Sequence, residues 1–415
     1  MGIIPWSAPD SGGIKWRKPD AASASRIHYV RRQTEIFFPD ALHIHRNRRR
    51  HGLPLTSRLT DLLGIELPLL LAPMAGPGTP ELAIAVAEAG GLGSLPCAML
   101  GAEAIEREFG IIRQRTSRPI NVNFFCHKPP VRDAAHEERW KALFVPYYVE
   151  LGIDPAAPIV AAERRPFDDA ACKLVERFKP EVVSFHFGLP EASLLARVKA
   201  AGARVISSAT TAAEARWLEA NGCDAIIAQG YEAGGHHGIF LADDPVAALA
   251  NQAGTMALVP QVVDAVKVPV IASGGISDAR GIAAAFALGA SAVQIGSAYL
   301  HCPEAKVHAG HREALRTAAD NATAVTNVYS GRPARGIVNR LMREVGPISP
   351  DAPAFPNAAT ASGPLRAKAE AAGSVDFTPL WAGQAAGLGR AMPAGDVTRA
   401  LMKEARSIIK KLATD

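Results

Sequence analysis

Short apolar runs recur along the chain from about Thr56, and segments with helical spacing of apolar residues separate them. Continuous apolar runs of this kind are typical of parallel strands that are buried on both faces. We predict eight strands, the first of them together with its exit loop, at residues 69–76, 92–95, 120–125, 182–188, 204–208, 224–227, 269–273 and 292–295. A predicted helix follows each strand, which indicates βα units that share one parallel sheet.

The alternation covers about 240 residues, which is the size of a (β/α)₈ TIM barrel. A doubly wound open sheet is the alternative fold. The segment after the first strand, Ala75-Gly76-Pro77-Gly78, argues against it, because it lacks the spacing of a dinucleotide-binding turn and carries a proline. We therefore predict an α/β chain with a TIM barrel over residues 56–300.

Two parts of the chain depart from this alternation of strands and helices. Residues from about 126 to 180 hold two helical segments, near 137–144 and 168–178, joined by a proline-containing connection. We interpret them as a helical insertion over the mouth of the barrel. Residues 301–415 predict a mostly helical C-terminal extension that packs on the barrel, closed by an amphipathic helix near 396–412.

The positive charge of the chain is concentrated at its start. The formal net charge is +5, and residues 1–55 hold ten Lys and Arg against four Asp and Glu. Residues 56–415 therefore hold 35 of the 45 basic residues and 36 of the 40 acidic ones. Because these charges nearly balance, this part of the chain has no electrostatic reason to bind nucleic acid. Because residues 1–55 lack periodicity, we predict a disordered basic leader, or sequence upstream of the true start codon. A nucleic-acid-binding arm and a transit peptide are the alternatives.

The cysteines and the hydropathy narrow the class of protein. Five cysteines, at positions 97, 126, 172, 223 and 302, form neither a CxxC pair nor a metal-ligand spacing. An odd set without such spacing indicates reduced thiols, so we expect a cytoplasmic protein. No apolar run of about 18 residues is present, and we expect no membrane association.

One glycine-rich loop, Ala228-Gln229-Gly230-Tyr231-Glu232-Ala233-Gly234-Gly235-His236-His237-Gly238, follows the sixth predicted strand. Glycine lets a backbone approach a flat ligand closely, and histidine exchanges a proton near neutral pH. The loop therefore suits the placement of an imidazole beside a planar group. The alternative is a surface loop with two solvated histidines.

The last two predicted strands end in Ser273-Gly274-Gly275-Ile276 and in Gln294-Ile295-Gly296-Ser297. In a TIM barrel, the loops at the carboxyl ends of the strands form the active face, and phosphate is often bound after strands seven and eight. Both segments precede helices, whose free N–H groups and dipoles attract an anion. We predict a phosphate site here, although the glycines could instead serve close helix–strand packing.

Two amides end other strands on the same face. Asn123 and Gln229 both donate and accept hydrogen bonds, so they suit the edge of a heterocycle, or each could simply cap its strand. With a single phosphate site they favour FMN over NAD, which needs a second phosphate site. No Ser-His-Asp order, nucleophile elbow or zinc spacing is present, and we predict no metal.

The remaining polar residues near this face are less distinctive. We interpret His186 as a hydrogen-bonded wall residue, with a second acid/base as the alternative. His237 is expected to face solvent. Asp224 or Glu232 could orient a histidine.

Several segments, in this order, resemble the class I nitronate monooxygenases, formerly called 2-nitropropane dioxygenases. The resemblance covers about residues 58–390 and is carried by Ala72-Pro73-Met74-Ala75-Gly76, Asn121-Val122-Asn123-Phe124, Ser184-Phe185-His186-Phe187-Gly188, the glycine-rich loop through His236, Ala272-Ser273-Gly274-Gly275-Ile276, Gln294-Ile295-Gly296-Ser297, Tyr329-Ser330-Gly331-Arg332-Pro333-Ala334-Arg335-Gly336 and Trp381-Ala382-Gly383-Gln384.

The resemblance implies a TIM barrel that holds FMN non-covalently. It implies that His236 is the catalytic histidine, and that the flavin is contacted by Met74, Asn123, Gln229, Gly234, Gly275, Gln294, Ile295, Gly296 and Ser297. The implied reaction is the oxidation of alkyl nitronates, such as propionate 3-nitronate, by O₂ to a carbonyl compound and nitrite.

Other functions remain open on the sequence. An FMN-dependent NAD(P)H:quinone or enoyl-thioester reductase would use the same barrel. A flavin-binding or nucleic-acid-binding module without turnover, and a flavin-free phosphosugar barrel, are further alternatives.

Overall fold

The computed structural model describes residues 58–131, 133–157 and 164–414. The predicted basic leader, residues 1–55, lies outside the described residues. The described part of the chain begins with helix α1 (Arg58–Leu63).

Eight parallel strands form one sheet in the order β1-β9-β8-β6-β5-β4-β3-β2. Their bounds are β1 (Leu69–Leu71), β2 (Gly93–Pro96), β3 (Ile120–Phe125), β4 (Val182–His186), β5 (Arg204–Ala209), β6 (Ala225–Gln229), β8 (Val270–Ser273) and β9 (Ala292–Ile295). The sheet closes on itself where Leu70 bridges Leu92 in parallel, and the N–H of Leu71 donates to the carbonyl oxygen of Leu92 at 2.9 Å. The predicted TIM barrel is therefore confirmed.

The strands are apolar on both faces because each face meets a different part of the core. Leu70 lies in a cluster inside the barrel, whereas its neighbours Leu69 and Leu71 lie in the larger cluster between strands and helices. This alternation is the period-two geometry of a strand. Leu59 and Leu63 of α1 belong to the inner cluster, so α1 closes one end of the barrel.

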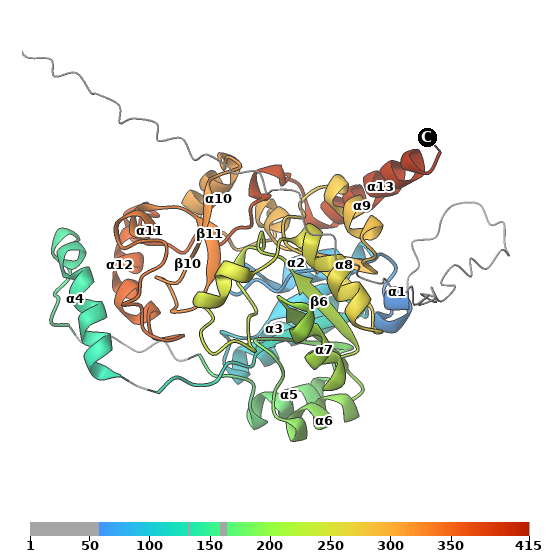
Figure 1. Ribbon diagram of the computed structural model, residues 1–415, viewed down its shortest axis with the longest axis horizontal. Coiled ribbons are helices and arrows are strands. Elements are labelled where there is room, and N and C mark those ends of the chain that lie inside the picture. The colour runs from blue at the N-terminus through green and yellow to red at the C-terminus, as the bar shows by residue number, and fades with distance from the viewer. Residues whose placement is uncertain (1–57, 132, 158–163, 415) are drawn as a thin grey trace, which may run out of the picture. The chain divides into compact units, whose positions relative to one another are not determined.

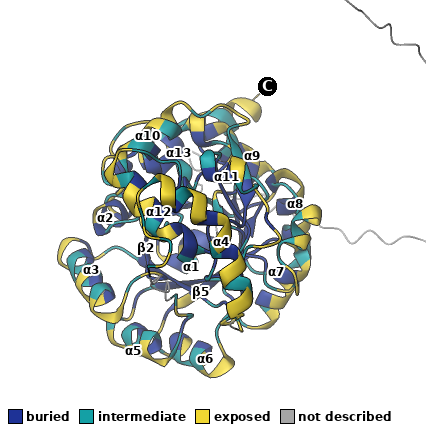
Figure 2. Ribbon diagram, turned by 90° about the vertical axis from the view of Figure 1, so that its left-hand side faces the viewer, coloured by how far each residue is buried: buried dark blue, intermediate teal, exposed yellow. Residues whose placement is uncertain are grey.

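A ring of helices surrounds the strands, with buried faces inward and exposed faces outward (Figure 2). The ring contains α2 (Pro80–Glu88), α3 (Ala102–Arg115), α5 (Asp169–Phe178), α6 (Ala192–Ala200), α7 (Ala212–Ala220), α8 (Thr255–Ala265), α9 (Ala279–Ala287) and α13 (Ala394–Leu412). Helix α5, which fell inside the predicted insertion, packs between α3 and α6 as a ring helix. Helix α13 packs against α9 and α2, and thus takes the eighth position although more than ninety residues separate it from β9.

The chain between β9 and α13 covers one end of the barrel (Figure 1). It forms η2 (Ser297–His301), α10 (Ala309–Arg316), β10 (Thr323–Thr326), β11 (Ala334–Ile337), α11 (Arg340–Glu344), α12 (Ala359–Ala371) and η3 (Ala386–Leu388). Strands β10 and β11 were absent from the predicted helical extension. They join the two-residue strand β7 (Gly235–His236) in a three-stranded antiparallel sheet, and a short helix η1 (Ala247–Asn251) follows β7.

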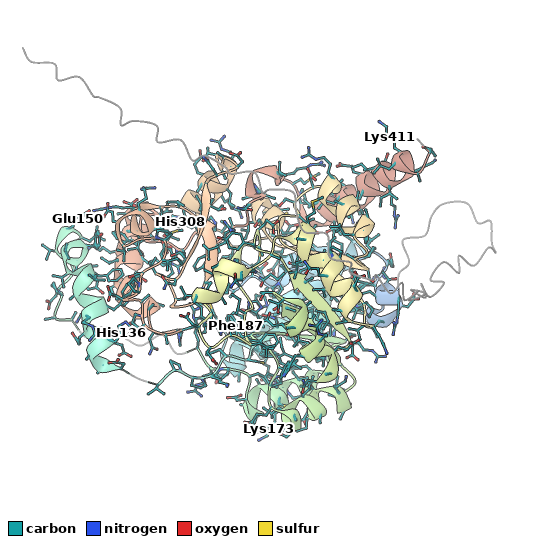
Figure 3. All side chains as sticks on the ribbon, in the orientation of Figure 1. His136, Glu150, Lys173, Phe187, His308 and Lys411 are labelled. Carbon is teal, nitrogen blue, oxygen red and sulfur yellow. The ribbon has the colours of Figure 1, made fainter. Side chains whose placement is uncertain are left out.

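Helix α4 (Ala134–Glu150) is the part of the predicted insertion that leaves the ring. It packs on α12 through a buried aromatic face, in which the indole N–H of Trp140 donates to the carbonyl oxygen of Ala358 at 3.0 Å. An ion pair between Glu150 and Arg340 ties the far end of α4 to α11. Figure 3 shows Glu150 and His136 marking the two ends of α4, away from the barrel.

Candidate active site

A cavity of about 190 Å³ opens at the carboxyl ends of the barrel strands. Its lining includes nine residues that the sequence singled out, namely Met74, Asn123, Gln229, Gly234, His236, Gly275, Gln294, Gly296 and Ser297. The tenth, Ile295, lies apart from them, because its side chain is buried in the core between strands and helices. The barrel thus brings residues from five separate stretches of sequence to one cavity.

The loops after β8 and β9 form one side of the cavity. Gly274 and Gly275 adopt φ values of 110° and 67°, which lie in the left-handed region that favours glycine. Within the described residues, the main-chain N–H groups of residues 274–277 find no acceptor. Four free N–H groups in a strand-to-helix turn form a site suited to an anion.

The amide of Gln294 offers a ligand a second hydrogen-bonding group. Its Oε1 atom is buried and has no hydrogen-bond partner among the described residues. A buried oxygen without a donor costs free energy, so a ligand N–H that reached it would be stabilised. The thioether of Met74 lies close by, since a Cβ atom built on Gly296 would come within 3.6 Å of its sulfur.

Asn123 and Gln229 are already engaged by the protein. The amide nitrogen of Asn123 donates to the hydroxyl oxygen of Ser184 at 3.0 Å. Gln229 donates from Nε2 to the carbonyl oxygen of His236 at 3.0 Å, and its Oε1 accepts from the N–H of Gly238 at 2.7 Å. Gln229 therefore braces the loop that carries His236, and each amide keeps only part of its capacity for a ligand.

His236 stands on β7, which pairs with Ala334 and Arg335 of β11. Its Nε2 lies 2.9 Å from the hydroxyl oxygen of Ser330, and its ring packs 5.5 Å from that of Trp381. Burial lowers the pKa of His236 well below its usual value, and the positive charge of Arg164 lowers it further. The imidazole is therefore neutral at pH 7.

His186 is a neutral wall residue. Its Nε2 donates to the carbonyl oxygen of His236 at 3.1 Å, which leaves Nδ1 to accept from the hydroxyl of Ser208 at 2.5 Å. Burial lowers its pKa to about 4. Because both ring nitrogens are engaged, His186 supports the backbone of the loop that carries His236.

His237 corrects an expectation from the sequence, because it is fully buried and does not face solvent. Its Nδ1 lies 2.5 Å from Oε1 of Gln252, and its ring packs edge-on against Tyr231. The pairing of β7 with β11 covers this side of the loop, which a linear pattern could not reveal. Burial lowers the pKa of His237 to about 4.

Neither candidate carboxylate orients His236. Asp224 accepts from the N–H of Val205 at 2.7 Å, at the opposite end of the barrel strands. Glu232 accepts from the N–H and the hydroxyl of Thr255, both at 2.8 Å, and so fixes the start of α8.

Some lining and contact residues escaped the sequence reasoning. Ser330 and Trp381 lie in segments that the resemblance included, but nothing local marked them as neighbours of His236. Arg164 lies in the proline-containing connection and also lines the cavity. In the sequence, the only feature that distinguished Arg164 was its positive charge in the connection between two predicted helices.

The described residues bring together no group of three or more His, Cys, Asp or Glu side chains that could hold a metal ion. Within the same residues, no helix has both the length and the apolar character needed to cross a bilayer. The fold and the cavity define a TIM-barrel enzyme, with a neutral histidine and a turn of free main-chain N–H groups at the carboxyl ends of its strands.

Comparison with known proteins gives the family. The sequence profile of the family described as nitronate monooxygenase matches residues 56–404, so the chain belongs to that family of oxidoreductases. A nitronate monooxygenase of Paraburkholderia phytofirmans is 42% identical over 85% of this chain and 96% of its own length.

Two solved structures are also similar. A nitroalkane oxidase from Streptomyces ansochromogenes is 37% identical, with a TM-score of 0.78, over 86% of this chain and 100% of that one. FabK from Thermotoga maritima is 31% identical, with a TM-score of 0.66, over 86% of this chain and 99% of that one.

Proposed function

We propose that the chain oxidises alkyl nitronates with O₂ to a carbonyl compound and nitrite, with FMN in the cavity and His236 beside the flavin. The observation that carries this proposal is that a neutral imidazole and a turn of free main-chain N–H groups line the same cavity. Propionate 3-nitronate is the substrate we propose to test first.

The residues of the cavity fit FMN. The free N–H groups of residues 274–277 would hold the phosphate. The unpartnered Oε1 of Gln294 would accept from an N–H of the flavin ring, and Met74 would contact the ring. When bound, the flavin supplies the electron transfer and the reaction with O₂.

His236 performs the protein's part of the chemistry. The hydroxyl of Ser330 donates to the carbonyl oxygen of Arg332 at 3.3 Å, so it accepts from Nε2–H of His236. That tautomer leaves a lone pair on Nδ1, for which the described residues supply no donor. In this form His236 can take the carbon-bound proton of a neutral nitroalkane, and the imidazolium that results can hydrogen-bond the anionic nitro group.

An absorption spectrum tests the proposal directly. We expect the purified protein to be yellow, and we expect propionate 3-nitronate in air to yield nitrite while O₂ is consumed. A colourless protein that FMN does not reconstitute would contradict the proposal. Rapid bleaching of the flavin by NADH without air, together with no nitrite formation, would favour the reductase alternative.

We also propose that the protein is located in the cytoplasm. All five cysteines are free and four are buried, which supports the reduced, cytoplasmic environment expected from the sequence.

A further inference from the structure

The cavity carries one permanent charge. Among the described residues that line it, Arg164 is the only Lys, Arg, Asp or Glu. Arg332 and Arg335, which lie nearby, donate to the carbonyl oxygens of Ile239 and Tyr231. Within the described residues the guanidinium of Arg164 has no such acceptor and no carboxylate partner. A half-buried cation without a partner favours an anionic ligand.

Arg164 is held in place although it lies outside the helices and strands. The Nε2–H of His127 donates to the carbonyl oxygen of Arg164 at 3.1 Å. The guanidinium lies over the ring of Phe355, 5.5 Å from its centroid, and the His127 and Phe355 rings pack edge to face at 4.8 Å. The backbone and the head group are thus both fixed, which lowers the entropy cost of binding.

The same aromatic ring connects Arg164 to the catalytic histidine. The centroid of the Phe355 ring lies 5.4 Å from that of the His236 ring. Of the charged groups, Arg164 lowers the pKa of His236 most. A short molecule that contacts His236 at one end can therefore meet Arg164 at the other. This arrangement separates a place for the reacting nitro group from a place for a second anion.

We propose that Arg164 is a specificity-determining residue, whose guanidinium binds a carboxylate at the end of the substrate opposite the reacting carbon. The inference rests on the proposed nitronate oxidation. A guanidinium pairs with a carboxylate through two parallel hydrogen bonds, which gives direction as well as attraction. A nitronate that ends in a methyl group leaves Arg164 unpaired in the cavity, and is bound less well.

The test compares two substrates that differ only at that end, propionate 3-nitronate and propyl-1-nitronate, in the wild type, Arg164→Met and Arg164→Lys. We expect Arg164→Met to lower kcat/KM for propionate 3-nitronate on the order of 10- to 100-fold, mainly through KM. Turnover of propyl-1-nitronate and the flavin content should change little. Arg164→Lys should recover part of the loss, because it keeps the charge without the planar fork.

Two further measurements keep the test specific. The exposed Arg139 of α4 does not line the cavity, so Arg139→Met should behave as the wild type with both substrates. Propionate, which has the carboxylate but no nitro group, should perturb the flavin absorption band of the wild type and do so more weakly in Arg164→Met.

The outcomes are distinct. Equal losses with both nitronates in Arg164→Met would overturn the inference, because the arginine would then serve the nitro group or the cavity as a whole. An unchanged preference would overturn it as well. A wild type that oxidises neither nitronate would reject the proposed function instead, and propionate binding would still decide the role of Arg164.

Discussion

At the scale of single residues, the protonation state of one histidine governs the proposed chemistry. An imidazole acts as a base only while it is unprotonated. Burial and the positive charge of Arg164 lower the pKa of His236, so the ring is neutral throughout the physiological range. Ser330 fixes Nε2, and His186 and Gln229 hold the carbonyl oxygen of His236. The residue is thus immobilised by both its ring and its backbone.

Replacing His236 by asparagine tests this role. His236→Asn should keep the flavin, because no free N–H of residues 274–277 is altered, and should lose on the order of 10- to 100-fold in nitronate oxidation, because a hydrogen bond to the anionic nitro group is removed. Oxygen uptake with propionate 3-nitronate and the flavin absorbance measure the two effects. His136 of α4 lies away from the cavity (Figure 3), so His136→Asn is the matched control. Unchanged turnover in His236→Asn would remove the residue from its role.

At the scale of elements, short segments far apart in the chain build the cavity together. Strand β7 has two residues and pairs with β11, while Gln229 and His186 hold the carbonyl oxygen of His236. The segment around Gly383 lies against the loop that leads into β7, since the N–H of Gln384 donates to the carbonyl oxygen of Glu232 at 3.0 Å. The N–H of Gly383 donates to the hydroxyl oxygen of Ser297 at 2.8 Å. A Cβ atom added at Gly234 would come within 2.4 Å of the main-chain nitrogen of Gly383.

This close approach predicts a specific effect of Gly234→Ala. The methyl group must push the backbone of Gly383 away, which disturbs Ser297 and the adjoining anion-binding turn. We expect a clear loss of bound flavin, read from the ratio of flavin to protein absorbance. Gly110, inside α3, has nothing within 4 Å of an added Cβ atom, so Gly110→Ala is the control.

The control should keep its flavin and gain up to about 1 kcal/mol in the free energy of unfolding, because alanine favours a helix over glycine. Equal flavin contents in Gly234→Ala and Gly110→Ala would contradict the packing argument.

At the scale of the whole molecule, the fold buries several histidines as neutral groups. Burial lowers the pKa of His127, His186, His237 and His311 to about 4. In the unfolded chain these groups have their usual pKa near 6.5. Their contribution to stability is therefore fully present above pH 6.5 and is lost as the pH falls toward 4.

Acid should accordingly destabilise the protein before its carboxylates titrate. Between pH 6.5 and 4 each of these histidines lowers the free energy of unfolding by up to about 1.4 kcal/mol per pH unit. Urea unfolding followed by tryptophan fluorescence at pH 7.5, 6 and 5 measures the change. A midpoint that does not move across this range would show that these rings are protonated in the folded state.

The extent of the family match leads to a prediction about the chain as a whole. The match covers residues 56–404, and the barrel, cavity and α13 all lie within residues 58–414. We expect a chain that begins at residue 56 to keep its flavin and its turnover of propionate 3-nitronate. Loss of turnover on truncation would assign a catalytic role to residues 1–55.

The barrel was predictable in detail because its signals are local. Strand Leu69–Leu71 is a continuous apolar run and Val270–Ser273 is apolar up to its last residue, and helices such as α3 carry a buried stripe that the sequence displays. The strand ends then placed Gly275, Gln294 and their neighbours on one face. The short strands β10 and β11 were missed, because Thr323–Thr326 and Ala334–Ile337 become strands by pairing with each other and with β7.

The sequence by itself determined the order of strands and helices, and with it the face on which the glycine turns and His236 lie, because hydrophobic periodicity and turn residues act over short distances. Only the tertiary structure decided what surrounds each side chain. It buried His237, turned the amide of Gln229 to its own loop, brought Ser330 and Phe355 against His236, and brought Arg164 to the cavity. These contacts depend on long-range packing and desolvation, to which no local pattern corresponds.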